Sequence, residues 1–455
     1  MKKQVPVFKN NDYNVKIQDL TYQGMGVAKV DDFPIFIENT LPGEEVKVRV
    51  TKVQKNFAFG RALEWTETSP DRVPELDKAY TQTGIASLQH LAYPKQLEFK
   101  QHQVAEDFSK AKIDVDVLPT IGMEDPTHYR NKAQVPVRSV KGKTETGFYR
   151  QHSHDLVPIE DFYIQDPKID EAIIVARDLL RKYMITPYDE LQDKGVMRNI
   201  MVRRGYYSHQ LMIVFVTRTK KIPMVDEIVK ELGEQLPELV SIMQNVNQKK
   251  TNVIMGKSTK LLWGKGYIED QLLGLTFAIS PRSFYQVNPQ QTEKLYSLAI
   301  EKAGLTGQET VIDAYCGIGT ISLALAQHAQ QVYGVDIVFD AIEDAKINAQ
   351  KNHITNANFV TAKAEDQMQT WEEAGLKPDV IVVDPPRKGL DESLIEAASH
   401  MAPKKIVYVS CNPSTLVRDV QRFMDRGYHI SGPVQPVDQF PQTPHVESVT
   451  VLEKD

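Results

Sequence analysis

From about residue 276 onward, short apolar runs alternate with segments whose apolar residues follow helical spacing. The runs contain few polar residues, and they begin at Val311, Val332, Asn358, Val380 and Lys405. Near-continuous apolar strands are typical of a parallel sheet that is covered on both faces. Because strands and helices alternate, the sheet belongs to the α/β class, and we predict a doubly wound, Rossmann-like domain over residues 276–455.

The first 68 residues follow a different pattern, in which apolar and polar positions alternate. Together with turn signals such as Pro42-Gly43, this alternation indicates about five short strands and a small OB-like β-barrel. Cations lie near aromatic residues in this segment: Lys47, Arg49, Lys52 and Lys55 beside Phe57 and Phe59. Such a mixture suits nucleic acid, where cations take phosphates and rings stack on bases. A solvated strand face fits the same residues.

Residues 69–275 mix strand and helix patterns, which predicts a central α+β region. A helix is expected over residues 94–111, with Leu97, Val104 and Phe108 at helical spacing. We expect it to pack on the C-terminal domain. Further predicted elements are strands over 132–140, 197–204 and 211–217 and a helix over 224–236.

Positive charge gathers in two groups within the central region. The first group is Arg130, Lys132, Arg138, Lys141, Lys143 and Arg150; the second is Arg198, Arg203, Arg204, Arg218, Lys220 and Lys221. In a chain whose net charge is −6, such groups could line an RNA-facing surface. Ordinary solvated surface is the alternative for about half of them.

Only two of the 455 residues are cysteine, Cys316 and Cys411. This count excludes a disulfide framework and any all-cysteine zinc or iron–sulfur site, and it favours a reducing compartment. No apolar run approaches the length of a membrane span, and the basic N-terminus lacks the apolar core of a secretory signal. We therefore expect a cytoplasmic protein without a membrane partner.

The segment Asp313-Ala-Tyr-Cys-Gly-Ile-Gly-Thr follows a predicted strand and opens a predicted helix. Gly317 and Gly319 permit a tight turn and a close approach of the backbone to a ligand. Asp336 ends the next strand, where a carboxylate can hold the ribose hydroxyls of a nucleoside cofactor. Ser322 replaces the third glycine of dinucleotide-binding loops, so the pattern favours S-adenosylmethionine over NAD.

Two more predicted strands end in residues with chemical potential. Asp384-Pro-Pro-Arg387 ends the fourth strand and Ser410-Cys411-Asn-Pro ends the fifth. Both therefore lie at the carboxyl edge, where α/β sheets bind ligands. A surface turn and an inert buried cysteine are the structural alternatives. Weaker candidates on residue type alone are Gln286, Asn288 and Glu447.

Along almost its whole length the chain resembles the S-adenosylmethionine-dependent RNA uracil-5-methyltransferases. The resemblance rests on the motifs Phe284-Tyr-Gln-Val-Asn, Tyr315-Cys-Gly-Ile-Gly, Asp384-Pro-Pro-Arg, Ser410-Cys-Asn-Pro and His445-Val-Glu. The N-terminal segment resembles the TRAM domain, an oligonucleotide-binding barrel of RNA-modifying enzymes. The resemblance implies methyl transfer to C5 of uridine, with RNA rather than DNA as the partner.

The resemblance also assigns roles by position. Cys411 would be the nucleophile that adds to uracil C6, and Glu447 the general base. Asp384 would help to read the uracil edge, and Arg387 could stabilise the enolate oxygen. The residues expected at the cofactor are Gln286, Tyr315, Gly317, Asp336 and Asp384. Cys316 is given no covalent role.

One departure from the family concerns an iron–sulfur cluster that many relatives hold. Thr83-Gly-Ile-Ala86 replaces a pair of cluster cysteines, and Asp77 and Phe162 align with the other two. We therefore expect no cluster and no required metal. This form resembles the Gram-positive branch that modifies 23S rRNA, in some cases at two uridines. We expect that substrate and a monomer; the alternatives are a tRNA substrate or an RNA-binding assembly factor with an inactive methyltransferase fold.

Overall fold

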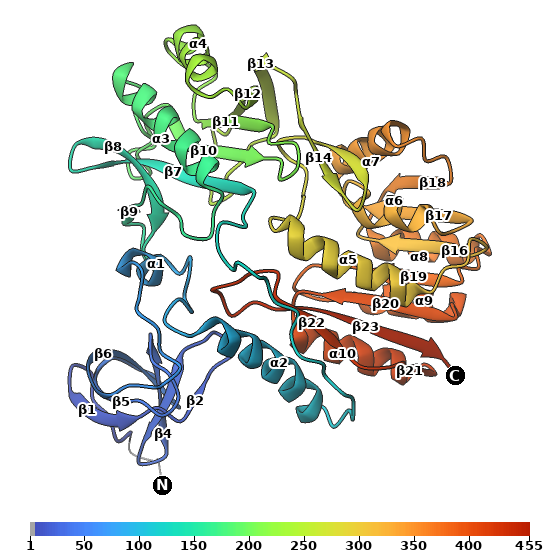
Figure 1. Cartoon of the computed structure of the whole chain (residues 1–455), viewed down its shortest axis with the longest axis horizontal. Coiled ribbons are helices and arrows are strands. Elements are labelled where there is room, and N and C mark those ends of the chain that lie inside the picture. Colours follow the sequence, from blue (N-terminus) through green and yellow to red (C-terminus); the bar gives the residue numbers. More distant parts are fainter. Residues whose placement is uncertain (1–4) are drawn as a thin grey trace.

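The computed structural model describes residues 5–455 (Figure 1). Its N-terminal part is a six-stranded sheet in the order β1-β5-β6-β4-β3-β2, which curls around its own apolar cluster. The sequence predicted about five strands; the extra one arises because β1 and β2 divide the segment that begins the chain. The strands are β1 (Asp12–Lys16), β2 (Asp19–Leu20), β3 (Gly26–Val30), β4 (Phe33–Glu38), β5 (Glu45–Val53) and β6 (Ala58–Glu67).

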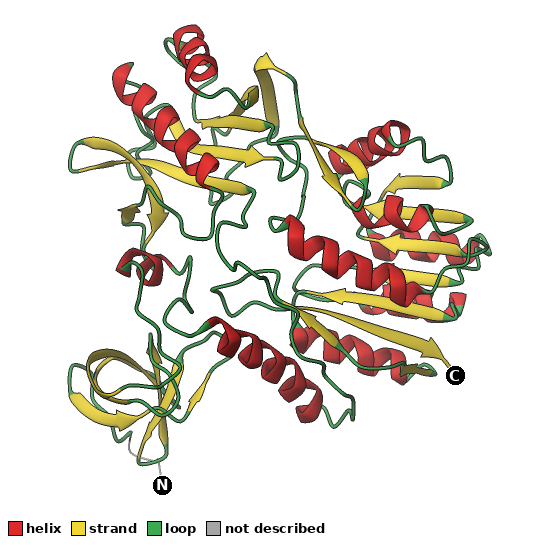
Figure 2. Ribbon diagram, viewed as in Figure 1, coloured by secondary structure: helices red, strands yellow, loops and turns green. Residues whose placement is uncertain are grey.

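The central part is a seven-stranded sheet in the order β13-β12-β11-β10-β7-β8-β9. The helices α3 and α4 cover one of its faces (Figure 2). The predicted strands are confirmed as β7 (Lys132–Val140), β10 (Met197–Arg204) and β11 (Leu211–Thr217). The other elements are α1 (Lys78–Thr83), β8 (Lys143–Tyr149), β9 (Leu156–Pro158), α3 (Pro167–Lys182), α4 (Val225–Gln235), β12 (Leu239–Val246) and β13 (Ser258–Gly264).

The C-terminal part is the predicted doubly wound sheet, in the order β18-β17-β16-β19-β20-β23-β21 with β22 beside β23. Alternate strand residues enter two apolar cores, so that Val311 packs on one face and Ile312 on the other. The strands are β16 (Thr310–Ala314), β17 (Gln331–Asp336), β18 (Ala357–Thr361), β19 (Val380–Val383), β20 (Lys405–Ser410), β21 (Tyr428–Ile430), β22 (Gln435–Val437) and β23 (Glu447–Lys454).

Helices cover both faces of this sheet (Figure 2). One face carries α5 (Pro289–Ala303), α6 (Thr320–Ala326) and α7 (Phe339–Lys351). The other face carries α8 (Ala364–Glu373), α9 (Glu392–Met401) and α10 (Pro413–Met424). The hairpin of β14 (Ile268–Leu272) and β15 (Leu275–Ile279) packs against α7 and links this part to the central one. No helix within residues 5–455 is long and apolar enough to cross a bilayer.

The long helix α2 (Tyr93–Lys110) packs against α10 of the C-terminal part. Its buried face contains Val104 and Phe108, as predicted, but Leu97 is only partly buried. Gln96 and Lys100 complete the buried face instead. The apolar spacing could not reveal this, because Lys100 pairs with Asp438 and Gln96 bonds Gln442, both more than 300 residues away, in addition to the bonds from Gln96 to the nearby carbonyls of Leu88 and Leu91.

Candidate active site

Strand register brings the predicted site residues to one edge of the C-terminal sheet. Ser410 of β20 pairs with Ser448 of β23 in antiparallel register, so Cys411 and Glu447 occupy the next positions on neighbouring strands. Val383 pairs with Tyr408 in parallel register, which places Asp384 at the adjoining strand end. The sequence predicted Asp384, Cys411 and Glu447 as separate candidates, and the strand register places them side by side.

The glycine loop closes against the end of β17. The backbone N–H of Gly317 donates to the Asp336 carboxylate at 3.1 Å, and the other carboxylate oxygen accepts from the N–H of Val338 at 2.8 Å. Tyr315 has a left-handed backbone, with φ of 72°, which turns the chain out of β16. Each oxygen of Asp336 retains acceptor capacity beyond these bonds. The glycine loop and Asp336, which the sequence predicted at one site, are therefore in direct contact.

Ser322, at the position of the missing third glycine, donates its hydroxyl to the Asp313 carboxylate. The second oxygen of Asp313 is buried and has no hydrogen-bond partner within residues 5–455. Burial raises the pKa of Asp313 to about 7. A buried acceptor without a partner is costly, so this oxygen is a candidate for contact with a ligand donor.

The two strand-end motifs are bonded to one another. Asn412 caps α10 and donates its side-chain N–H to the backbone carbonyl of Arg387 at 3.0 Å. This bond holds the Asp384-Pro-Pro-Arg387 turn beside the cysteine. Arg387 also contacts the imidazole of His445 at 3.3 Å. One short loop therefore fixes the positions of an arginine and a thiol.

Cys411 is half-buried, and its surroundings oppose the thiolate. Desolvation raises the pKa of the Cys411 thiol to about 12, the carboxylates of Glu447 and Asp384 add to the shift, and Arg387 opposes it. Cys316 is buried, and desolvation raises its pKa well above the usual value, in keeping with a packing role. Both cysteines lie near carboxylates, Cys316 near Asp313 and Asp336 and Cys411 near Glu447 and Asp384, but only Cys411 also has an arginine, Arg387, beside it.

The side chains of Asp384 and Glu447, termed the acid pair below, are both carboxyl groups with raised pKa values. Burial raises the pKa of Asp384 to about 7. Glu447 is almost fully buried; desolvation and then the neighbouring Asp384 raise its pKa well above the usual value. Such shifts are typical of groups that exchange protons near neutral pH.

Tyr296 of α5 also belongs to this site, although its helical spacing indicates only a core residue. Its buried hydroxyl accepts a hydrogen bond from Gln286 Nε2 at 3.3 Å, and desolvation, followed by the charges of Asp384 and Glu447, raises its pKa. Tyr296 thus connects Gln286 with the acid pair. Asn288, in contrast, is fully buried as the cap of α5 and donates to the Gln439 carbonyl, so its expected ligand role is wrong.

Helix α2 fixes the segment that leads to Glu447. The buried ammonium of Lys100 forms an ion pair with the buried carboxylate of Asp438, which also accepts from Tyr93 Oη at 2.8 Å. Gln96 exchanges hydrogen bonds with Gln442. Because residues 438–442 are held from outside the sheet, the N-terminal half of the chain helps to place the acid pair.

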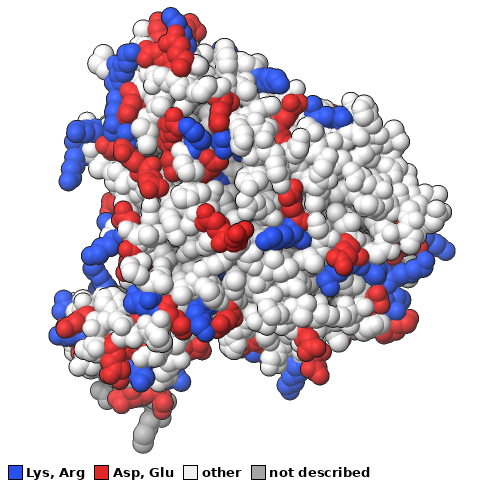
Figure 3. Space-filling view, in the orientation of Figure 1, with Lys and Arg blue, Asp and Glu red and all other residues white. Residues whose placement is uncertain are grey.

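Several of the basic residues expected at RNA are instead structural. Arg204 pairs with Asp166 and Glu238, each at 2.7 Å. Arg218 pairs with Asp193 at 2.9 Å, Arg138 pairs with Glu190, and buried Arg198 donates to backbone carbonyls. Figure 3 shows acidic and basic side chains intermixed on the face in view, without an extended basic area. Lys141, Lys143, Arg150, Lys220 and Lys221 are exposed.

Three cations of the two groups lack such a partner. No ion pair up to 4.0 Å includes Arg130, Lys132 or Arg203 anywhere in residues 5–455. Lys132 and Arg203 pair directly across β7 and β10. Desolvation, Arg203 and Arg130 lower the pKa of Lys132 to about 7. These three residues, termed the unpaired cation cluster below, concentrate positive charge in a poorly solvated place.

The unpaired cation cluster adjoins the segment that carries Gln286. Asn131, between Arg130 and Lys132, donates its side chain to the Gln286 carbonyl at 3.1 Å and its backbone N–H to Val287 at 2.9 Å. Arg203 donates to the carbonyl of Ser283. The cluster is thus bonded to residues 283–287, the segment that contains Gln286. The sheet edge with Asp384, Cys411 and Glu447 is termed the catalytic edge below.

Two apolar features are exposed near the predicted site, and only the first of them belongs to a motif that the sequence analysis identified. Phe284 is 67% exposed although it lies next to buried Tyr285, and Ile337 and Phe339, directly after Asp336, are 64% and 63% exposed. The signal that could have found the second pair is an apolar residue run after an acidic strand end. Exposed apolar side chains beside a concave site offer contact area to a planar ligand.

The positions that replace the cluster cysteines are occupied by ordinary packing. Phe162 is buried against Phe148, with ring centroids 4.9 Å apart, and Ala86 is buried in the same apolar cluster. Asp77 caps α1, and Thr83 donates its hydroxyl to the Ala79 carbonyl. Within residues 5–455 no group of three or more His, Cys, Asp or Glu side chains is arranged to hold a metal ion.

Comparison with known proteins identifies relatives over the full chain. Residues 92–455 match the family described as tRNA (uracil-5-)-methyltransferase, and residues 6–63 match the TRAM domain. An RNA methyltransferase of Lactiplantibacillus plantarum is 66% identical over 100% of both chains, and one of Enterococcus faecalis is 53% identical over 99% of both.

A solved structure shares the whole architecture. The tRNA (uracil-54, C5)-methyltransferase of Pyrococcus abyssi, in complex with S-adenosyl-L-homocysteine, is 30% identical. It superposes with a TM-score of 0.78 over 96% of this chain and 99% of that one.

Proposed function

The chain belongs to the tRNA (uracil-5-)-methyltransferase family, S-adenosylmethionine-dependent RNA methyltransferases, and from that premise we propose that it methylates C5 of uridine in 23S rRNA through a covalent bond from Cys411 to C6. The observation that carries this proposal is the register of β19, β20 and β23, which collects Asp384, Cys411 and Glu447 beside the glycine loop.

The residues of the glycine loop fit S-adenosylmethionine, which supplies the methyl group when it is bound. Asp336 retains lone pairs for two ribose hydroxyls, and exposed Ile337 and Phe339 offer apolar surface for adenine. The partnerless oxygen of Asp313 suits a cationic amino group. Tyr315 and Gln286, which the sequence also placed here, remain proposed contacts.

Uracil C5 is too weak a nucleophile to take a methyl group directly, so the protein must first activate the ring. Cys411 Sγ gives its proton to the Asp384 carboxylate and bonds to C6, while the C5–C6 π electrons move toward the C4 oxygen. The resulting enolate carries electron density at C5, which takes the methyl group.

The second half of the reaction restores the ring. The Glu447 carboxylate removes the C5 proton, the released electron pair re-forms the C5–C6 double bond, and the C6–S bond breaks. The Cys411 thiolate that leaves takes its proton back from Asp384, and Glu447 releases the C5 proton to solvent. Arg387, beside the thiol, stabilises negative charge as it develops. In this proposal Asp384 hydrogen-bonds the uracil edge.

The target uridine must leave its base stack to reach Cys411. We assign the unpaired cation cluster to the RNA phosphates next to that uridine, because a poorly solvated group of cations is stabilised by an anionic ligand. The TRAM barrel adds Phe36, Phe57 and Phe59, whose ring centroids lie 5.3–6.1 Å apart, as a second RNA-binding surface.

Fewer observations bear on the RNA substrate than on the reaction. The absence of cysteine at positions 77, 83, 86 and 162 resembles the cluster-free Gram-positive branch that acts on 23S rRNA. The Pyrococcus abyssi relative favours the second candidate, because its own substrate is tRNA. The support for 23S rRNA is thus the resemblance, and tRNA is the alternative.

Methyl transfer to isolated RNA classes tests this function. The protein is incubated with methyl-labelled S-adenosylmethionine and with purified 23S rRNA or tRNA from a strain that lacks its gene. We expect label in 5-methyluridine of 23S rRNA. Label confined to tRNA would exclude the rRNA assignment, label in an exocyclic amine would exclude the C5 mechanism, and no label in either RNA would favour an inactive assembly factor.

A further inference from the structure

A cavity of about 390 Å³ lies in the central part, outside the catalytic edge. Its lining is rich in aromatic and imidazole rings, and includes His128, Asn131, Arg204, Tyr206, Tyr207 and His209. Tyr207 is 46% exposed, and the rings of Tyr206 and Tyr207 meet edge to face with centroids 4.9 Å apart. We term this cavity the tyrosine pocket.

The loop that carries the two tyrosines is held rigidly by a buried acid. Asp270 of β14 is fully buried, and its carboxylate accepts the backbone N–H groups of Tyr206, Tyr207 and Ser208 at 2.8, 2.9 and 3.2 Å. Desolvation raises the pKa of Asp270. A buried carboxylate that fixes an exposed aromatic loop indicates a preorganised binding surface rather than a passive connection.

The tyrosine hydroxyls are tethered to α5. Tyr207 Oη donates to Glu293 at 2.7 Å, and Gln290 donates to Tyr206 Oη. With the hydroxyl ends fixed, each ring has little freedom to lose when a planar ligand stacks on it. The loop therefore offers flat apolar area at low entropic cost.

The tyrosine pocket is connected to both segments that build the active site. Asn131, in its wall, is bonded to residues 286 and 287, and α5 begins only a few residues after Gln286. Tyr129, also in the wall, donates to the carbonyl of Pro441, on the segment that leads to Glu447. A ligand in this pocket thus lies close to the catalytic edge.

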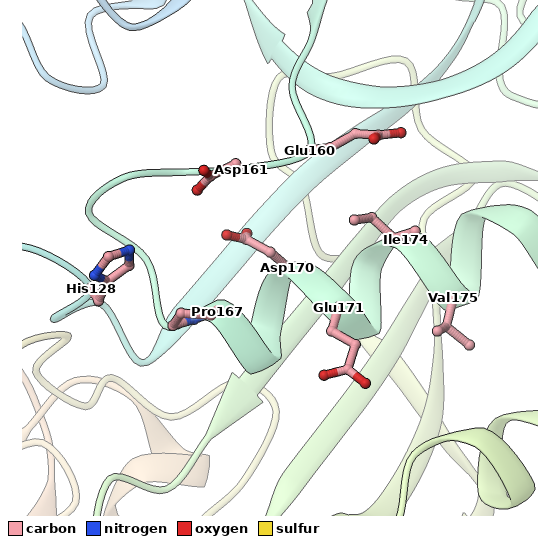
Figure 4. Close-up of a pocket in the computed structure, with 8 residues that line it drawn as sticks. All are labelled: His128, Glu160, Asp161, Pro167, Asp170, Glu171, Ile174 and Val175. Atoms are coloured by element: carbon pink, nitrogen blue, oxygen red, sulfur yellow. The ribbon is translucent and has the colours of Figure 1, made fainter. Parts of the chain in front are cut away.

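Charge also distinguishes this pocket from a neighbouring one. A second cavity of about 440 Å³ shares His128, but Glu160, Asp161, Asp170 and Glu171 line it (Figure 4). Four carboxyl groups would repel an RNA chain. In the tyrosine pocket the acid Asp166 is already paired with Arg204, so the rings set its character.

We propose that the tyrosine pocket binds a second, non-target base of the RNA, turned out of its stack and held on Tyr206 and Tyr207. This inference rests on the proposed function, because it takes RNA as the substrate. The rings supply stacking that tolerates any base, and His128 and His209 supply polar edges. The pocket anchors the RNA next to the uridine that reacts.

Photocrosslinking and kinetics together test the pocket. Total RNA that contains 4-thiouridine, from a strain lacking the gene, is irradiated with the full-length protein, and the linked peptides are identified by mass spectrometry. We expect crosslinks within residues 205–210. The double variant Tyr206→Ala/Tyr207→Ala should raise KM for RNA by about 10-fold or more, since base stacking contributes about 1–3 kcal/mol per base. Its affinity for S-adenosylmethionine should not change.

Two controls separate stacking from general damage. Tyr206→Phe/Tyr207→Phe keeps both rings and should retain a KM near that of the wild type. Tyr183→Ala removes another tyrosine of the central part that also hydrogen-bonds a glutamate, Glu231, and should leave KM unchanged. If the double alanine variant does not fold, the KM of His209→Ala for RNA and the position of the crosslinks test whether the pocket binds RNA.

If crosslinks formed only in other segments and the alanine variant had the KM of the wild type, the tyrosine pocket would not bind RNA. The proposed function would still stand if the protein methylated uridine in the methyl-transfer assay. Crosslinks in the loop without any 5-methyluridine would retain the RNA pocket and remove the proposed reaction. An alanine effect that the phenylalanine variant shares would exclude stacking.

Discussion

The catalytic edge of the C-terminal sheet and the part of the central sheet attached to it both hold buried charge, but of opposite sign. At the edge, Asp384 and Glu447 lie together, and the pKa of each is raised. In the central sheet, Arg130, Lys132 and Arg203 form no ion pair up to 4.0 Å within residues 5–455, although Asp344 acts on Arg203 from farther away, and desolvation lowers their pKa values. Neither group is neutralised by the other.

Uncompensated buried charge is costly, and proteins retain it where a ligand supplies the opposite charge. Acids suit a cationic cofactor and proton transfer, whereas cations suit phosphate. We infer that chemistry belongs to the acidic side and RNA affinity to the basic side. Substitutions on the acidic side should therefore lower the methylation rate, and substitutions on the basic side should weaken RNA binding.

The largest effect is expected from Cys411→Ala. Without the thiol no bond to C6 can form, so C5 stays inert, and the methylation rate should fall by about 10⁴-fold or more. Binding of RNA and of S-adenosylmethionine should stay within about twofold, as measured by filter binding and calorimetry. Substantial activity in this variant would exclude covalent catalysis by Cys411.

A smaller but still large effect is expected from Lys100→Met. Lys100 is a buried cation that does have its acid, Asp438. Removal of the lysine leaves that carboxylate buried and alone, which should lower the free energy of unfolding by about 3–5 kcal/mol. Denaturant unfolding measures this loss, with exposed Lys95→Met on the same helix as the control. An unchanged free energy of unfolding would mean that the Lys100–Asp438 pair does not hold helix α2 to the segment before Glu447.

The opposite stability result is expected from Arg130→Met/Lys132→Met. Because neither cation forms an ion pair within the described residues, their removal should leave the free energy of unfolding unchanged or raise it. The Kd for RNA should rise by about 10–100-fold, and the salt dependence should lose about two units of slope, one for each phosphate contact. Exposed Lys141→Met/Lys143→Met, on the nearby turn, is the control for charge alone. Unchanged RNA affinity would move the RNA path elsewhere.

The smallest effect is a pH dependence of single-turnover methylation. A carboxyl group acts as a base only when it is ionised, and burial raises the pKa of Asp384 to about 7 and that of Glu447 above its usual range. The rate should therefore rise with pH through the neutral range, by up to about tenfold per unit below the pKa. Asp384→Asn removes one negative charge beside Glu447, so its residual activity should shift toward lower pH. A flat profile from pH 6 to 8 would contradict a raised carboxyl pKa.

Sequence patterns predicted the sheet edge well and the basic side poorly. Apolar runs mark buried strands, and the residues that follow them must lie at one edge, so Asp384 and Cys411 could be placed without a structure. The partner of a cation leaves no local trace. Arg204 pairs with Glu238, whereas Lys132 has no acid within 4.0 Å among residues 5–455, and nothing in the neighbouring sequence distinguishes the two cations.

Side chains with a second role were missed for a related reason. Tyr296 has the spacing of a core residue in α5, and only the packed structure shows its hydroxyl beside Gln286 and the acid pair. Gln96 and Lys100 interrupt the apolar stripe of α2, yet both are buried by contacts with residues 438–442. The burial of these polar side chains depends on partners far away in the sequence, which a local pattern does not reveal.

The most direct test of the central claim is the capture of the covalent adduct. RNA that contains 5-fluorouridine is incubated with the protein and S-adenosylmethionine, and the mixture is denatured, digested and analysed by mass spectrometry. Fluorine cannot leave C5 as a cation, so the reaction should stop after methyl transfer, with the nucleotide bound to the Cys411 peptide and none on the Cys316 peptide. An adduct on another residue, an adduct that persists in Cys411→Ala, or the absence of any adduct while normal RNA is methylated would contradict the account.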